Sequence, residues 1–162
     1  MADFIGNRYL KKSNIPKDAF VIFDGGKFYR GCSLAAESGE HEQCIIENGI
    51  LKLKALNVNP YRQYKLIVNQ SPESGTGKTP NNFGLDIAIP TPDIIDVQRL
   101  DVYGAEKSYR LERLWNEKKV YRYRIDKSGE TSFRVIISVF VANGQSATVG
   151  QTLLGIRSIW FE

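Results

Sequence analysis

The sequence predicts an all-β protein, specifically an antiparallel jelly-roll-like β-sandwich of about eight to eleven short strands. Its 162 residues include 16 Ile, 10 Val, 6 Thr and 18 aromatic residues, but only 9 Ala. These β-branched and aromatic residues, 50 of the 162, are the types enriched in strands. Turn signals rich in Gly, Pro and Asn recur every ~8–12 residues, which is the spacing of a sandwich or barrel. We therefore expect an N-terminal arm over residues 1–18 and a single β-sandwich domain over residues 19–162.

Two β-hairpins are predicted in the first third of the chain. Residues 19–23 and 27–32 flank a turn that contains two glycines, which adopt positive φ without steric cost. Residues 44–47 and 50–56 flank Asn48-Gly49, the strongest two-residue hairpin signal. In the strand after this turn apolar residues alternate with lysines, so we expect one buried and one solvated face.

Further strands are expected over residues 61–68, 83–89, 94–103, 108–115, 120–125, 133–141 and 153–161. The segment 133–141 is almost entirely apolar, which is typical of a central strand. The last segment is equally apolar and is expected to be locked inside a sheet. Asp86 alternates with Leu85 and Ile87, which predicts that its carboxylate points to the solvated face.

The long polar segment 69–82 is expected to be an inter-strand loop. It contains a Gly-Lys-Thr sequence at 77–79, like the end of a phosphate-binding P-loop. Pro72 occupies the position of the first glycine of that motif, and no helix-forming residues follow Thr79. The pattern therefore does not favour nucleotide binding.

Few side chains suited to catalysis or metal binding are available. Cys32, His41 and Cys44 offer three soft ligands, whereas zinc sites normally need four. Of the three alternatives, a metal site, a disulfide and two free thiols, the spacing favours free thiols. We expect no metal, no cofactor and no enzymatic activity, and a hydrolase built on His41 is the third-ranked hypothesis.

Charge and hydropathy limit the partners. The net charge is only +4, and the densest basic stretch, from Arg110 to Arg124, is interrupted by Glu112 and Glu117, so we expect no nucleic-acid partner. No apolar run approaches the roughly 20 residues that a membrane-spanning helix needs. The N-terminal sequence has no basic stretch followed by an apolar core, so no secretion signal is expected.

One aromatic and basic cluster is a candidate binding site, and its members are Trp115, Tyr121, Arg122, Tyr123 and Arg124. On a strand the two tyrosines share one face and the two arginines share the other. In one interpretation the tyrosines belong to the core and the arginines face solvent. In the other, the aromatic rings stack on sugar rings and the arginines bond sugar hydroxyls.

The C-terminal third, with residues 121–125, 133–140 and 155–161, resembles the closing strands of jelly-roll β-sandwiches. Galactose-binding-like carbohydrate modules and many bacteriophage virion proteins share this pattern. The resemblance implies an architecture and no individual binding residue. We expect a non-enzymatic structural subunit of a virion, such as a tail, baseplate or head decoration, that contacts other protein subunits in the particle or in the host cytoplasm before assembly. The alternative is a carbohydrate-binding module with a glycan partner.

Overall fold

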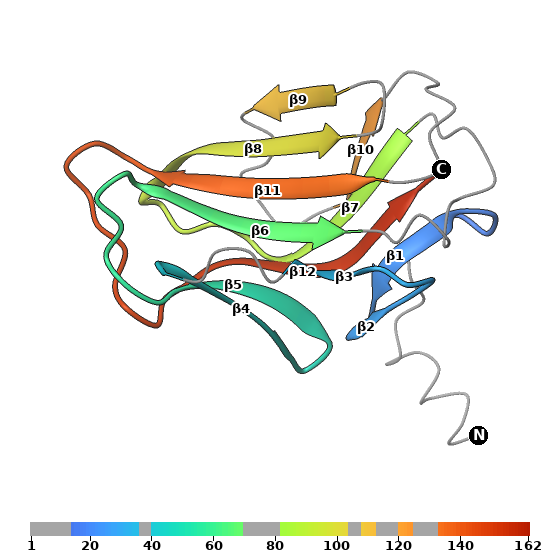
Figure 1. The fold of residues 1–162 in the computed structure, drawn as a ribbon, viewed down its shortest axis with the longest axis horizontal. Helices are drawn as coiled ribbons and strands as arrows, with labels where there is room; N and C mark the ends of the chain where they lie inside the picture. The colour runs from blue at the N-terminus through green and yellow to red at the C-terminus, as the bar shows by residue number, and fades with distance from the viewer. Residues whose placement is uncertain (1–13, 36–39, 70–81, 104–107, 113–119, 125–132) are drawn as a thin grey trace.

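The structure is a computed structural model that describes residues 14–35, 40–69, 82–103, 108–112, 120–124 and 133–162. The described residues form twelve strands and no helix, arranged in one seven-stranded and one five-stranded antiparallel sheet. The two sheets pack face to face, and β7 and β12 cross the long strands of the smaller sheet at a steep angle (Figure 1). This arrangement confirms the predicted antiparallel β-sandwich.

The strands, in chain order, are β1 (Phe20–Asp24), β2 (Lys27–Phe28), β3 (Ser33–Leu34), β4 (Glu42–Glu47), β5 (Ile50–Ala55), β6 (Gln63–Asn69), β7 (Asn82–Ile89), β8 (Ile95–Tyr103), β9 (Ser108–Glu112), β10 (Val120–Arg124), β11 (Arg134–Val141) and β12 (Thr152–Phe161). Most lie within one or two residues of the predicted segments. Strand β2 covers only the first two residues of the predicted segment 27–32, and the two-residue β3 lies where a loop was predicted.

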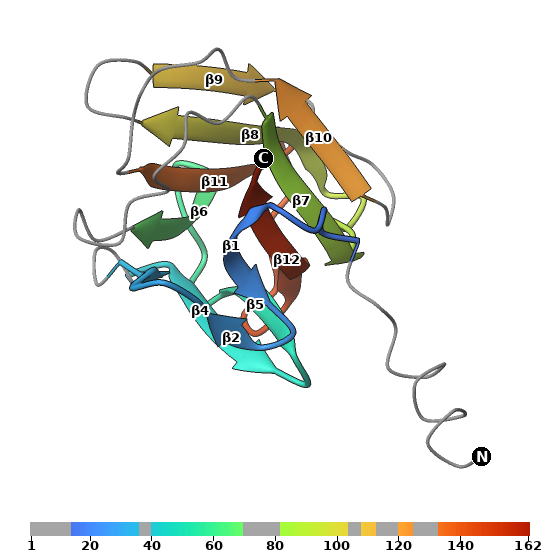
Figure 2. The same cartoon turned by 90° about the vertical axis from the view of Figure 1, so that its right-hand side faces the viewer.

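The seven-stranded sheet is built around β12, the longest strand. One edge of β12 pairs with β7. The other edge pairs with β5 along its first half and with β1 along its second half. The remaining members are β10 beside β7, β2 beside β1 and β4 beside β5 (Figure 2). The prediction that the apolar C-terminal strand is locked inside a sheet is therefore confirmed.

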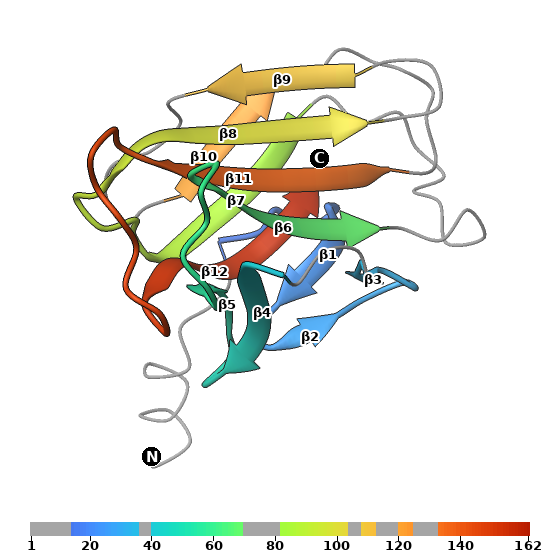
Figure 3. The ribbon, with the colours of Figure 1, turned by 60° about the vertical axis from the view of Figure 1, so that its left-hand side comes forward.

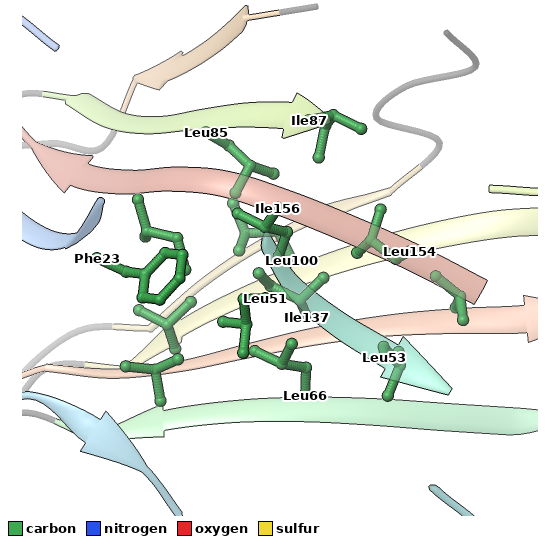
Figure 4. Packing of buried hydrophobic residues seen from close by; sticks show 14 of the residues in the cluster. Phe23, Leu51, Leu53, Leu66, Leu85, Ile87, Leu100, Ile137, Leu154 and Ile156 are labelled. Atoms are coloured by element: carbon green, nitrogen blue, oxygen red, sulfur yellow. The ribbon is translucent and has the colours of Figure 1, made fainter. Parts of the chain in front are cut away.

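The five-stranded sheet has the order β3-β6-β11-β8-β9, so β11 is its central strand, as the apolar sequence predicts. Its inward face carries residues such as Leu66, Leu100 and Ile137, which are 0% exposed. These side chains meet Leu51, Leu53, Leu85, Ile87, Leu154 and Ile156 from the larger sheet (Figure 4). Burial of each such side chain contributes about 1.5–3 kcal/mol.

The two predicted hairpins differ in outcome. In the second, Asn48 and Gly49 have φ of 53° and 78°, the left-handed pair that a type I′ turn requires, which confirms the prediction. In the first, the returning strand ends at Phe28 instead of Cys32. Arg30 and Gly31 also adopt positive φ, 53° and 75°, and this second turn separates β2 from β3.

The prediction that Asp86 faces solvent is wrong. Its neighbours Leu85 and Ile87 point into the core, so the carboxylate lies on the outer face of β7, yet it is only 3% exposed. Asn14 Nδ2 donates a hydrogen bond to Asp86 Oδ2 at 3.0 Å. The end of the predicted N-terminal arm thus lies against the larger sheet, and a sequence pattern within β7 contains no sign of this distant contact.

Candidate functional site

The site begins as a pocket of about 330 Å³ where the loop before β6 meets the start of β4. Its walls are formed by residues from three short segments, Glu40, His41, Glu42, Asn59, Tyr61, Gln63 and Lys65. Ligand pockets measure roughly 300–1,000 Å³, so this one suits a small chemical unit. Four of these residues come from the β5–β6 connection and β6, and backbone hydrogen bonds join the ends of that connection to the ends of the one between β11 and β12, which lies at the same end of the sandwich (Figure 3).

Local hydrogen bonds hold the β5–β6 connection in one shape. The buried Tyr64 hydroxyl donates to the carbonyl of Asn57 and accepts from the N–H of Asn59, both at 3.0 Å. The Asn59 side chain accepts the Tyr61 N–H at 2.8 Å and donates to the Gln63 carbonyl. Arg62, which has a positive φ of 67°, donates through Nη1 to the Val141 carbonyl at 2.6 Å. The shape of the loop is therefore fixed by bonds within the protein itself.

This loop presents one aromatic ring to solvent. Tyr61 is 82% exposed, the highest value among the exposed large hydrophobic residues of the described chain. A tyrosine on a rigid loop offers an apolar face and a polar tip together. Its ring stands at the edge of a pocket whose other lining groups are polar or charged.

The opposite wall supplies acidic and imidazole groups. Glu42 is only 6% exposed, and its Oε1 has no hydrogen-bond partner. The buried Nδ1 of His41 also lacks a partner, and its Nε2 lies 3.9 Å from Glu40 Oε2. Buried polar atoms are normally satisfied, so these two groups leave hydrogen-bonding capacity unused at the pocket. Among the described residues that line the pocket there is no Ser or Cys.

The pocket continues onto the outer face of the five-stranded sheet. Gln63 and Lys65 point outward because their neighbours Tyr64 and Leu66 are in the core. Gln63 Nε2 donates to Ser138 Oγ of β11 at 3.2 Å, and Lys65 is in register with the same serine. Ser138 is in turn in register with Arg99 of β8. A polar row therefore runs from the pocket across three strands.

The structure describes four of the five residues of the aromatic and basic cluster predicted from sequence. Tyr121 and Tyr123 of β10 are partly buried against the core, and their rings stack at 6.0 Å. Burial raises the pKa of Tyr123 well above its usual value. Arg122 and Arg124 are exposed, and Arg122 Nε forms an ion pair with Glu162 at 2.8 Å. Trp115 lies outside the described residues, so the complete set stays a prediction.

Neither cysteine is poised for chemistry. Both are free thiols, and burial raises the pKa of Cys32 to about 11 and that of Cys44 to about 12. Cys44 Sγ donates to the Lys65 carbonyl at 3.8 Å, directly behind the pocket wall. In the described part of the chain, no group of three or more His, Cys, Asp and Glu side chains is arranged to hold a metal ion. The same part contains no helix long and apolar enough to cross a membrane.

These thiols should react slowly with alkylating reagents in the folded protein. The thiolate is the nucleophile, and a raised pKa keeps both thiols protonated at pH 8. We expect mass spectrometry after iodoacetamide at pH 8 to show unmodified native protein and double modification in denaturant. Because the folded pKa exceeds the unfolded value of 9.0, both thiols should also favour the folded state below pH 9 and lose that contribution as the pH rises toward 11–12. Rapid native alkylation at pH 8 would contradict the burial of these thiols.

Comparisons with known proteins give information about the fold of this chain and not about its ligand. No protein-family model matches the chain, and the comparison with curated proteins finds no match. Among solved structures the chain is similar to PfGH50B, with a TM-score of 0.50 and 12% identity, over 81% of this chain and 22% of that chain. The chain thus spans about a fifth of the length of PfGH50B.

A weaker similarity, with a TM-score of 0.37 and 17% identity, relates the chain to CBM28, a carbohydrate-binding module specific for non-crystalline cellulose. It covers 93% of this chain and 96% of that one. At 12% identity the similarity to PfGH50B concerns the fold alone and indicates no shared ligand. The comparisons contain no observation in favour of a virion protein, so that hypothesis stays a prediction.

The sequence contained one usable signal for the pocket. In the predicted strand 61–68, alternation places Tyr61, Gln63 and Lys65 on the same polar face. An aromatic residue on that face has no place in the core, which is the signal for a binding surface. The contribution of Glu42 could not be found in this way, because β4 approaches β6 only through the packing of the two sheets.

Proposed function

We propose that this β-sandwich is a carbohydrate-binding protein without catalytic activity, and that the pocket beside Tyr61 is its glycan site. The observation that carries the proposal is the pairing of an exposed ring on an ordered loop with a buried, unsatisfied carboxylate in the same pocket. A sugar ring has an apolar C–H face for the tyrosine and hydroxyl donors for the carboxylate. The exposed Tyr61 and the buried Glu42 therefore match the chemistry of a saccharide.

The remaining polar groups fit the same ligand. The Gln63 amide is held by Ser138, so it enters the pocket in a fixed orientation. Lys65 supplies a further donor and His41 a group that donates or accepts. A site whose groups are ordered before binding spends little free energy on reorganisation, and this favours recognition over catalysis by a closing lid.

Truncation of Tyr61 should remove most of the affinity. A stacked aromatic side chain contributes roughly 1.5–3 kcal/mol of apolar burial. We therefore expect Tyr61→Ala to weaken glycan binding about tenfold or more, as measured by isothermal titration calorimetry with a ligand chosen from a glycan array. Tyr61→Phe keeps the ring and should retain most of the affinity.

The β10 cluster is the competing location for the same function. The double substitution Arg122→Ala and Arg124→Ala alters only exposed side chains on that strand. If the glycan site is the Tyr61 pocket, this variant binds like the wild type. Loss of binding in the β10 variant, with full affinity in Tyr61→Ala, would move the site to Arg122 and Arg124.

A structural subunit of a larger particle stays the second candidate. The end of the sandwich that carries Tyr61 also exposes Leu56, Val58 and Val149, by 40%, 57% and 60%. Backbone hydrogen bonds join Ala55 to Gly150 and Gln151, so these side chains belong to neighbouring loops. Such a surface suits a protein neighbour as well. Size-exclusion chromatography with light scattering distinguishes the two, because a stable closed oligomer favours the subunit.

A further inference from the structure

The outer face of the five-stranded sheet carries a cationic cluster beside the pocket. Arg99 of β8 and Arg110 of β9 converge on Asp101 from both sides, with Arg99 Nε 3.0 Å from Oδ2 and Arg110 Nε 2.6 Å from Oδ1. The Asp101 side chain is 4% exposed, whereas those of Arg99 and Arg110 are 21% and 54% exposed. The carboxylate is thus covered by the two guanidinium groups that it orients.

Further contacts fix the same two arginines. The Arg99 guanidinium stacks over the Phe140 ring at 5.0 Å. For Arg110, the hydrogen bond and charge of Asp101 and a hydrogen bond to Tyr103 raise the pKa further above its usual value. Both Asp101 bonds use Nε, the inner nitrogen of the guanidinium, and neither uses the outer fork of Nη1 and Nη2. Such a fork matches the geometry of a carboxylate or sulfate group.

The cluster is continuous with the pocket. Lys65 lines the pocket and is in register with Ser138, which is in register with Arg99. Strands lie about 4.8 Å apart, so the line from Lys65 to Arg99 spans roughly 10 Å. Arg110 is in register with Asp101, two residues further along β8, which places it roughly 16 Å from Lys65. Lys65 and Arg99 therefore lie on one row, which continues to Glu112 of β9. Asp101 is the carboxylate that Arg99 and Arg110 share.

We propose that the glycan bound by this face is anionic: an oligosaccharide that places one sugar at Tyr61 and a sulfate or carboxylate group against Arg99 and Arg110. This inference rests on the proposed glycan site and adds the class of ligand. The buried aspartate has a defined role in this arrangement, because it holds two arginines in place that would otherwise repel each other.

Two matched pairs of ligands test the inference by calorimetry. One pair is a sulfated galactan hexasaccharide and the same hexasaccharide after desulfation. The other is a hexagalacturonate and its methyl ester. We expect at least one anionic form to bind about tenfold more tightly than its neutral partner in 50 mM NaCl, and the difference to shrink in 500 mM NaCl as screening increases. The pair that shows the preference distinguishes sulfate from carboxylate recognition.

Three variants assign the preference to residues. Arg110→Gln should remove most of the preference and leave the affinity for the neutral form unchanged, and Arg110→Lys should restore part of it. Arg110→Gln removes one charged partner of the buried Asp101, so its melting temperature should fall, whereas that of Arg110→Lys, which keeps the charge, should fall less. The affinities are therefore compared well below both melting temperatures. Tyr61→Ala should weaken the binding of both forms.

Each contrary result has a distinct meaning. Equal affinity for charged and neutral forms, with both lost in Tyr61→Ala, would overturn the anionic inference and leave the glycan site intact. A preference that survives Arg110→Gln would also overturn the inference. Absence of binding by any of the four ligands at millimolar concentration, together with a negative glycan array, would contradict the glycan site and the inference alike.

Discussion

Gly84→Ala should destabilise this protein by about 3 kcal/mol or more, an effect far above that of an ordinary glycine-to-alanine change. A Cβ atom on Gly84 would lie 1.9 Å from Cε2 of Trp160 and 2.3 Å from its Cζ2 and Nε1. Trp160 is 0% exposed and stands in register with Gly84 on the neighbouring strand. The indole therefore lies directly over the glycine, on the face of the sheet opposite the core residues Ile159 and Phe161, and an added methyl group must displace it.

The expected loss is measurable as the free energy of unfolding in urea or as a fall of about 6–12 °C in the melting temperature. Gly144→Ala is the matched control, because Gly144 has a φ of 79° and nothing within 4 Å of the added atom. It should cost only the roughly 1–2 kcal/mol of a left-handed alanine. In the double variant with Trp160→Leu, the two losses should be less than additive, because the leucine lacks the ring atoms that clash. Wild-type stability of Gly84→Ala would contradict the close approach.

This contact shows where sequence patterns reach their limit. The strand around Gly84 was predicted correctly from its alternation, and so was the burial of the C-terminal strand. Each of those predictions depends only on residues a few positions apart. The contact of Gly84 with Trp160 joins residues far apart in the chain, and it depends on which strands become neighbours. A glycine within a strand indicates a close approach, but it does not identify the partner.

The same distinction applies to the candidate site. Alternation correctly separated Tyr121 and Tyr123 from Arg122 and Arg124, and the structure places the tyrosines against the core. The pocket, by contrast, combines the beginning of β4 with the loop before β6. Strands β4 and β6 belong to different sheets, so the two segments come together only when the sheets pack against each other. A cluster that is contiguous in sequence is therefore easier to notice than a pocket assembled from separate strands.

Tyr64→Phe is the second substitution with a large expected effect, although it removes a single oxygen atom. The Tyr64 hydroxyl donates to the Asn57 carbonyl and accepts from the Asn59 N–H in a partly buried position. Phenylalanine would leave both backbone groups without that partner, at a cost of about 1–3 kcal/mol. The ring itself is 1% exposed and packs in the core, so the aromatic contribution to stability should be retained.

The substitution should weaken glycan binding as well as folding. Asn59 positions Tyr61 through its side chain, and the Tyr64 hydroxyl holds the backbone of Asn59. Without that bond the loop samples other conformations, and glycan binding must then restore the order that the wild-type loop already has. We expect calorimetry to show a loss of affinity of about tenfold, together with a larger unfavourable entropy of binding. The side chains that contact the ligand are the same in both proteins.

The control is Tyr29→Phe, which removes the same atom from a side chain that is 41% exposed and remote from the pocket. It should change neither the free energy of unfolding nor the affinity. Full glycan affinity in a Tyr64→Phe variant that is less stable would show that the loop does not need to be ordered in advance. Equal losses in Tyr64→Phe and Tyr61→Ala would instead show that the exposed ring depends entirely on the buried hydroxyl beneath it.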